Sequence, residues 1–142
     1  MKKTGILNAQ LEAELTKLRH QDRFAIVDMG FPIPEGRNWV DISFVPGTPD
    51  FLLVLKSILR ELVVEEYTIF NDMEEYNNEM YQEVTALLHK QEVHKVSMEE
   101  FIEQVKTAKL VIRTGEFRPC SNMILTSASG VQDAVDEFNI IC

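Results

Sequence analysis

The chain has 142 residues, the size of one domain and enough to bury a hydrophobic core without disulfides or a metal. Its 14 basic and 23 acidic residues give a net charge of -9, which argues against nucleic acid or an anionic membrane surface as a partner. The two cysteines form no CxxC pattern or Cys/His ligand cluster, and no apolar segment approaches the length of a membrane span. Because no signal peptide is recognisable either, we expect a cytoplasmic protein with reduced cysteines.

The first predicted elements are a helix and a buried strand. Asn8 is a suitable N-cap, and leucines spaced at i, i+4 and i+7 form one apolar stripe on a helix expected to end near Arg19 or His20. Residues 24–27 form an unbroken apolar run, typical of a strand that is covered on both faces. Asp28 closes this run, and the glycine and prolines that follow restrict the loop beyond it.

A second strand and a buried helix come next. Apolar and polar residues alternate over 40–44, which predicts a half-buried strand that Pro46-Gly47 ends. Thr48 suits an N-cap and Pro49 a first helical position, so we expect a strongly apolar helix over residues 50–62.

Helices and strands alternate through the rest of the chain. Strands are predicted over 67–70, 93–96, 110–112 and 122–126. Helices are predicted over 74–89 and 97–107, the second beginning with a capping box between Ser97 and Glu100. The alternation predicts an α/β fold, a three-layer α/β/α domain with helices on both faces of a mostly parallel, mixed sheet. Residues 130–142 carry enough apolar positions for one more short helix or a docking arm.

Polar groups follow three of the predicted strands. They are Asp28, the pair Asn71-Asp72, and Arg113, which leads into a loop that ends at Asn122. Sheets of this class bind ligands beyond the carboxyl ends of their strands, and short loops braced by proline and glycine suit a preformed pocket for a small ligand. The sequence has no Walker loop, GxGxxG, GxSxG or HExxH motif, so the nucleotide-binding, serine-hydrolase and zinc-protease classes lack their usual support.

His20 is the strongest candidate for a general acid or base, because imidazole titrates near neutral pH. The commoner role for such a histidine is to bind the last carbonyls of a helix. Asp28 needs partners at the end of a buried strand, and either a ligand or the following turn supplies them. Cys120 has no base nearby in the sequence, which favours a wall residue over a nucleophile. His89 and His94 lie in charged surroundings and are expected to face solvent.

The spacing between His20 and Asp28 has a geometric consequence. An extended strand between them would place the two side chains on the order of 25 Å apart, at opposite ends of one subunit. One chain cannot then bring both residues to the same small ligand. We therefore favour a pocket shared between neighbouring subunits over an interrupted strand.

The sequence resembles the D-ribose pyranase and fucose mutarotase family over residues 1 to about 130, which leaves 131–142 as a C-terminal extension. The resemblance is carried by a set of segments in a fixed order: Met1-Lys2-Lys3, Leu7-Asn8, His20, 28–34, Asp41-Ile42, Gly47-Thr48-Pro49, 112–116 and Asn122. The Pro32-Ile33-Pro34 loop and the Lys2-Lys3 start favour the ribose pyranase branch.

The resemblance implies an isomerase that interconverts cyclic forms of a free monosaccharide without cofactor or metal. It also implies a ring-forming homo-oligomer, often a decamer. In that family the histidine matching His20 is the proton donor, and the residues matching Asp28 and Asn122 hold the sugar. Ring opening requires one proton delivered to the ring oxygen and one removed from the anomeric hydroxyl, which agrees with general acid/base catalysis.

Three positions depart from the family pattern. Met98 stands where the ribose branch usually has a histidine, Cys120 replaces a tyrosine, and Arg19 replaces a glycine. The expected substrate-binding residues are Asp28, Met98, Cys120, Ser121 and Asn122. Lost hydrogen-bond partners change either the affinity or the sugar that fits. A fucose-type mutarotase and a non-catalytic sugar-binding or regulatory protein are therefore the alternatives to a ribose pyranase.

Overall fold

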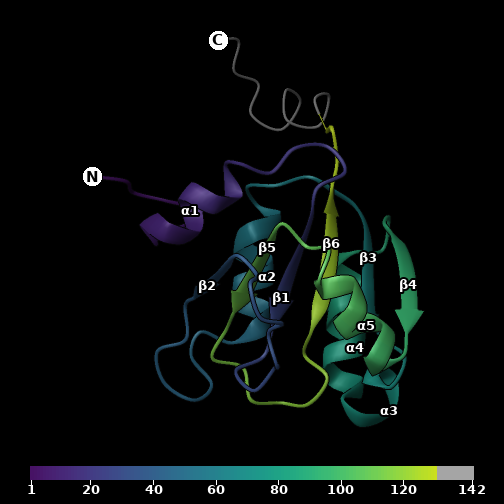
Figure 1. Cartoon of the computed structure of the whole chain (residues 1–142). Helices are drawn as coiled ribbons and strands as arrows, with labels where there is room; N and C mark the ends of the chain where they lie inside the picture. The colour runs from purple at the N-terminus through teal and green to yellow at the C-terminus, as the bar shows by residue number, and fades with distance from the viewer. Residues whose placement is uncertain (131–142) are drawn as a thin grey trace.

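The computed structural model describes residues 1–130, and the predicted tail element and C-terminal extension, 131–142, lie outside them (Figure 1). The described residues form one six-stranded sheet with five helices. The strands are β1 Arg23–Val27, β2 Trp39–Asp41, β3 Val64–Phe70, β4 Glu92–Val96, β5 Leu110–Arg113 and β6 Met123–Ser127. The helices are α1 Ala9–Leu15, α2 Phe51–Leu59, α3 Met73–Tyr76, α4 Asn78–Leu87 and α5 Met98–Val105.

The sheet is mixed, in the order β2-β5-β1-β6-β3-β4, with β2 and β4 at its edges. β1 pairs in parallel with β5, which pairs in parallel with β2, and β3 pairs in parallel with β4. β6 lies between β1 and β3 and is antiparallel to both. The antiparallel strand β6 begins at the end of the sheet where the parallel strands β1 and β5 terminate. The chain therefore passes from β5 to β6 through a loop and needs no helical crossover.

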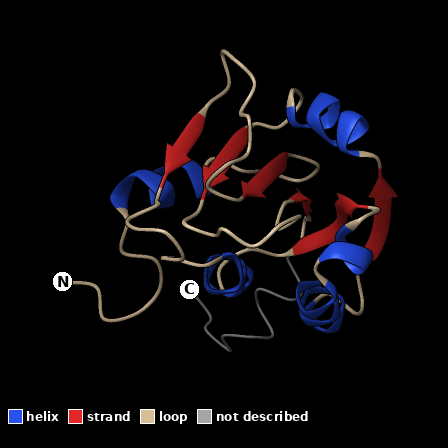
Figure 2. Cartoon of the chain, turned by 90° about the horizontal axis from the view of Figure 1, so that it is seen from below, coloured by secondary structure: helices blue, strands red, loops and turns tan. Residues whose placement is uncertain are grey.

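Helices cover both faces of the sheet (Figure 2). On one face, apolar residues of α1, α2 and α4 pack against Ile26, Tyr67 and Leu125 of the strands. On the other, Phe101 and Val105 of α5 join Ala25 and other strand residues in a second core. The predicted three-layer α/β/α architecture is confirmed. Within residues 1–130, no helix is both long and apolar enough to cross a bilayer.

The first helix is shorter than predicted. Asn8 caps α1 as expected, with its side chain accepting from the Leu11 amide, but the helix ends at Leu15 and not near residue 19 or 20. The carboxylate of Asp22 accepts a hydrogen bond of 2.7 Å from the Arg19 amide, and the Arg19 guanidinium donates to the Thr16 carbonyl. These side chains give the backbone partners outside the helix, a competition that ends helices early.

The second strand and the following helix also differ from their predicted bounds. β2 stops at Asp41, whose side chain accepts from the Ser43 amide in a local turn, and Phe44 is exposed. The N-cap of α2 is Asp50, which accepts from the Leu53 amide, so the predicted capping by Thr48 is wrong.

The helix predicted over 74–89 is divided into α3 and α4 at Asn77. The Asn77 carbonyl oxygen of the side chain accepts from the Met80 amide and caps α4. Its side-chain amide donates to the Pro119 carbonyl at 2.8 Å and to Ser121 Oγ at 3.2 Å. The break therefore ties the start of α4 to the loop between β5 and β6.

Candidate functional site

A cavity of about 170 Å³ lies beyond the carboxyl ends of β1 and β3. Nine residues line it: Asp28, Gly30, Phe31, Pro32, Phe70, Met98, Ile102, Cys120 and Asn122. Four of the five predicted substrate-binding residues are thus brought together. Ser121 is the exception, because its side chain is buried beside Asn77 and does not line the cavity.

Asp28 and Asn122 form a reciprocal pair in the polar part of this cavity. The Asn122 side-chain amide donates to Asp28 Oδ2 at 2.9 Å, and the Asp28 backbone amide donates to Asn122 Oδ1 at 2.9 Å. Asp28 Oδ1 accepts from the Gly30 amide at 3.0 Å. The two residues follow β1 and precede β6, so the antiparallel order of these strands brings them side by side.

Burial raises the pKa of the Asp28 carboxyl, the hydrogen bonds from Asn122 and Gly30 partly oppose this, and the negative charge of Glu116 adds to it. A half-buried carboxylate with a raised pKa and a fixed orientation is a strong acceptor for the hydroxyl groups of a ligand. Asn122, bound to Asp28 by two hydrogen bonds, offers a neutral amide beside it.

Cys120 adds a thiol to the cavity wall. Its backbone has a φ of 58°, in the left-handed region. Burial raises the pKa of the thiol, and the negative charges of Asp72 and Asp28 raise it further. A thiol held in its neutral form is a poor nucleophile, which supports the predicted role as a wall residue.

The remaining wall of the cavity is apolar. Phe31 and Pro32 come from the loop after β1, Phe70 from the end of β3, and Ile102 from α5. Phe101 of α5 packs edge-on against Phe31 and Phe70, with ring centroids 5.8 and 4.4 Å apart, and so holds these elements together. No sequence pattern indicated Phe70 or Ile102, because their place depends on how α5 packs on the sheet.

Glu116 braces the loop between β5 and β6, which carries Cys120 and Asn122 of the cavity lining, a role that the sequence did not indicate. Its buried carboxylate accepts from the Arg118 guanidinium at 2.8 and 2.9 Å and from the Phe51 amide at the start of α2 at 3.1 Å. Burial alone favours the neutral acid, but the hydrogen bonds from Arg118 and Phe51 together hold the pKa of Glu116 at about 2.

Backbone contacts hold the same loop in place. The backbone carbonyl of Glu116 accepts from the Met29 amide, next to Asp28. The preceding Gly115 lies so close to Thr48 that a Cβ there would overlap the Thr48 backbone.

His20 lies away from the cavity, before β1, whereas Asp28 follows that strand. Its half-exposed ring has Glu65 Oε2 at 3.4 Å and the side-chain amide of Gln21 at 3.4 Å. Within one chain, therefore, the candidate acid and the Asp28–Asn122 pair lie at opposite ends of the sheet, as the sequence predicted.

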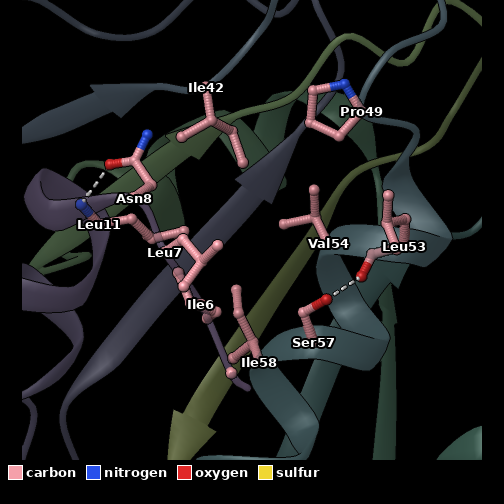
Figure 3. Close-up of a pocket in the computed structure, with 11 residues that line it drawn as sticks. Ile6, Leu7, Asn8, Leu11, Ile42, Pro49, Leu53, Val54, Ser57 and Ile58 are labelled. Carbon is pink, nitrogen blue, oxygen red and sulfur yellow. Dashed lines mark hydrogen bonds between the residues drawn. The ribbon is translucent and has the colours of Figure 1, made fainter. Parts of the chain in front are cut away.

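A second pocket, of about 330 Å³, lies between the segment 5–11 and α2 (Figure 3). Its lining is mainly apolar and includes Ile6, Leu7, Ile42 and Leu53. Two polar side chains in it already have partners in the chain: Asn8 accepts from the Leu11 amide and Ser57 donates to the Leu53 carbonyl. With no charged side chain in its lining, this pocket suits an apolar surface better than a sugar.

Comparisons with known proteins match this chain over most of its length. The RbsD / FucU transport protein family matches residues 1–131. A D-ribose pyranase of Petrotoga mobilis is 43% identical over 89% of this chain and 97% of its own length, and one of Geobacillus kaustophilus is 40% identical over 97% of this chain and 100% of its own.

Two solved structures extend the comparison. Bacillus subtilis RbsD, in complex with D-ribose, has a TM-score of 0.86 and 39% identity, covering 90% of this chain and 98% of that chain. The fucose mutarotase of Streptococcus pneumoniae, in complex with L-fucose, has a TM-score of 0.74 at 18% identity, covering 86% of this chain and 93% of that chain, and shares the fold. The resemblance found in the sequence is confirmed, and this chain belongs to the RbsD / FucU family.

Proposed function

We propose that the protein interconverts cyclic forms of a free monosaccharide, as a D-ribose pyranase does. The observation that carries this proposal is the reciprocal Asp28–Asn122 pair in a cavity at the strand ends, in a chain 40 to 43% identical to D-ribose pyranases over most of its length. The relative in complex with D-ribose makes a pentose the first sugar to test.

The chemistry requires proton transfers and orientation of the sugar. Asp28 accepts hydrogen bonds from sugar hydroxyls, and Asn122 donates to or accepts from a neighbouring one. His20 delivers a proton to the ring oxygen while a water molecule takes the proton of the anomeric hydroxyl, and the reverse transfers close the ring in another form. The apolar wall of Phe31, Pro32 and Phe70 packs against the carbon face of the sugar.

The active site is shared between subunits of a ring-shaped homo-oligomer, with a decamer as the predicted size. His20 of one subunit reaches the cavity of its neighbour, since it lies at the opposite end of its own sheet. Exposed apolar side chains surround the loop edge near this cavity, among them Met29, Phe44, Val45 and Phe117. An exposed apolar surface of this kind is typical of an interface. The apolar pocket beside α2 offers a second contact of the same character. The protein acts in the cytoplasm, on free sugar.

Saturation-transfer NMR on D-ribose, L-fucose and other free sugars tests the proposal. Exchange between ring forms above the uncatalysed rate is expected with D-ribose, and the sugar with the fastest exchange separates a ribose pyranase from a fucose-type mutarotase. His20→Ala is expected to abolish exchange while leaving sugar binding detectable. Binding without any exchange in the wild-type protein would instead identify a sugar-binding relative that does not catalyse the reaction.

A further inference from the structure

Glu66, Glu92 and His94 form a cluster on β3 and β4, away from the sugar cavity. Glu66 is paired with Glu92 in the register of the two parallel strands, and His94 is two residues further along β4 on the same face. None of the three residues lines that cavity: Glu66 lies four positions, roughly 13 Å, before Phe70 along β3, and His94 is level with Thr68, two positions, roughly 7 Å, before Phe70. The side chains are partly exposed and so accessible to a small ion.

The distances within the cluster match those between the ligands of one metal ion. His94 Nε2 lies 3.0 Å from Glu66 Oε2 and 3.7 Å from Glu92 Oε1, and one ligand atom of each residue lies within 4.8 Å of the others. Two donor atoms bound tetrahedrally to zinc, at about 2.1 Å each, are about 3.4 Å apart. The two observed distances lie on either side of this value, so small rotations of the side chains suffice to bind an ion.

A neighbouring strand orients one of these ligands. Thr126 Oγ1, on β6, donates to Glu66 Oε1 at 3.1 Å, while the other oxygen of Glu66 faces His94. Metal-bound carboxylates commonly have such a hydrogen-bonded partner, which fixes their orientation.

The local charge also favours a cation. Two carboxylates face one imidazole in a chain of net charge -9. The adjacent Lys95 does not compete, since it points to the other face of β4, where its ammonium binds Glu74 and Tyr81. The guanidinium of Arg23, on β1, donates to Gln104 of α5.

We propose that Glu66, Glu92 and His94 bind one divalent cation of the zinc class, with water completing its coordination. An imidazole with two carboxylates suits zinc, cobalt or nickel, whereas magnesium and calcium prefer oxygen ligands alone. The ion connects the edge strand β4 to β3 and Thr126 supports it from β6. The inference is independent of the proposed sugar chemistry.

Calorimetric titration of the metal-free, full-length protein with Zn²⁺ tests the site. We expect one ion per chain, and a thermal midpoint that rises with added Zn²⁺ because the ion binds the folded state. Co²⁺ is expected to give visible absorption bands of a site with nitrogen and oxygen ligands, and Mg²⁺ to produce no midpoint shift.

Three variants separate this site from adventitious binding. His94→Ala is expected to abolish the one-to-one binding and the midpoint shift, whereas His89→Ala, which removes an exposed histidine after α4, leaves both unchanged. Thr126→Val keeps the three ligands but is expected to weaken binding by roughly 10-fold. Binding that survives in His94→Ala, or that falls equally in His89→Ala, would overturn the proposal. The absence of a midpoint shift in the wild type, with that protein folded, would do the same.

Discussion

Mixing two inactive variants gives a direct test of the shared active site. His20→Ala removes the proposed proton donor and Asp28→Asn removes the carboxylate of the Asp28–Asn122 pair, so each variant alone is expected to show no exchange of D-ribose ring forms. If a site takes His20 from one subunit and Asp28 from the next, a mixed oligomer contains some sites in which both residues are intact. Random assembly of equal amounts makes about a quarter of the sites complete, because each of the two contributing subunits must be of the correct kind.

The assay is saturation-transfer NMR on oligomers formed by refolding or co-expressing the two variants together. Mixing separately assembled oligomers without subunit exchange serves as the control and is expected to stay inactive. A second mixture, of wild-type chains with the double variant, gives an independent check: about a quarter of full activity for a shared site against about half for a site within one chain. No activity in the co-assembled single variants, with half activity in the second mixture, would refute the shared site.

Three further predictions concern the walls of the cavity and their support. Glu116 has a pKa of about 2 in the folded protein against an ordinary value of 4.5. Its ionised form therefore stabilises the fold by on the order of 3 kcal/mol above pH 4.5, and this contribution is lost as the pH falls toward 2. Urea titrations should therefore show that Glu116→Gln lowers the free energy of unfolding at pH 7 but much less at pH 3, and an equal loss at both would contradict this assignment. Asn77→Ala removes the cap of α4 and two hydrogen bonds to the 119–121 loop, so it should lower the free energy of unfolding by about 1 kcal/mol in the same titration. It should also raise KM for the sugar more than it lowers kcat, and a normal KM would show that the loop holds its shape without Asn77. Met98→His places a hydrogen-bonding ring at the cavity and should tighten D-ribose binding by roughly 2- to 10-fold in an NMR titration, with Met98→Leu as the control that leaves it unchanged; equal affinities in the two variants would be inconsistent with a sugar in this cavity.

The fold could be predicted where local signals and tertiary packing agree. The apolar run 24–27 is fully buried in the middle of the sheet, as its pattern indicated. Ser97 caps α5 by accepting from the Glu100 amide at 3.2 Å, also as its sequence pattern indicated. The other half of that capping box is absent from the described contacts, since the Glu100 carboxylate accepts from Gln104.

Where tertiary contacts decide the structure, sequence patterns failed. The apolar positions of 74–89 continue with helical spacing through Asn77, and nothing local marks the break that its bonds to Pro119 and Ser121 produce. The same distinction separates the residues of the candidate site that could be predicted from those that could not. Asp28 and Asn122 stand at strand ends and were predicted, whereas Phe70 and Ile102 line the cavity only because α5 packs over β3. The catalytic role of His20 stays a prediction, since it depends on a neighbouring subunit.

The reversed direction of β6 has a consequence for how this family can diverge. Because β5 ends and β6 begins at the same end of the sheet, a single loop between them contains Glu116 and Cys120 and leads directly to Asn122. Changes in the length or composition of that loop can reshape the cavity while every strand pairing is preserved. The choice of sugar can thus change through one short segment, provided that Glu116 and the contacts of this loop with Asn77 are kept.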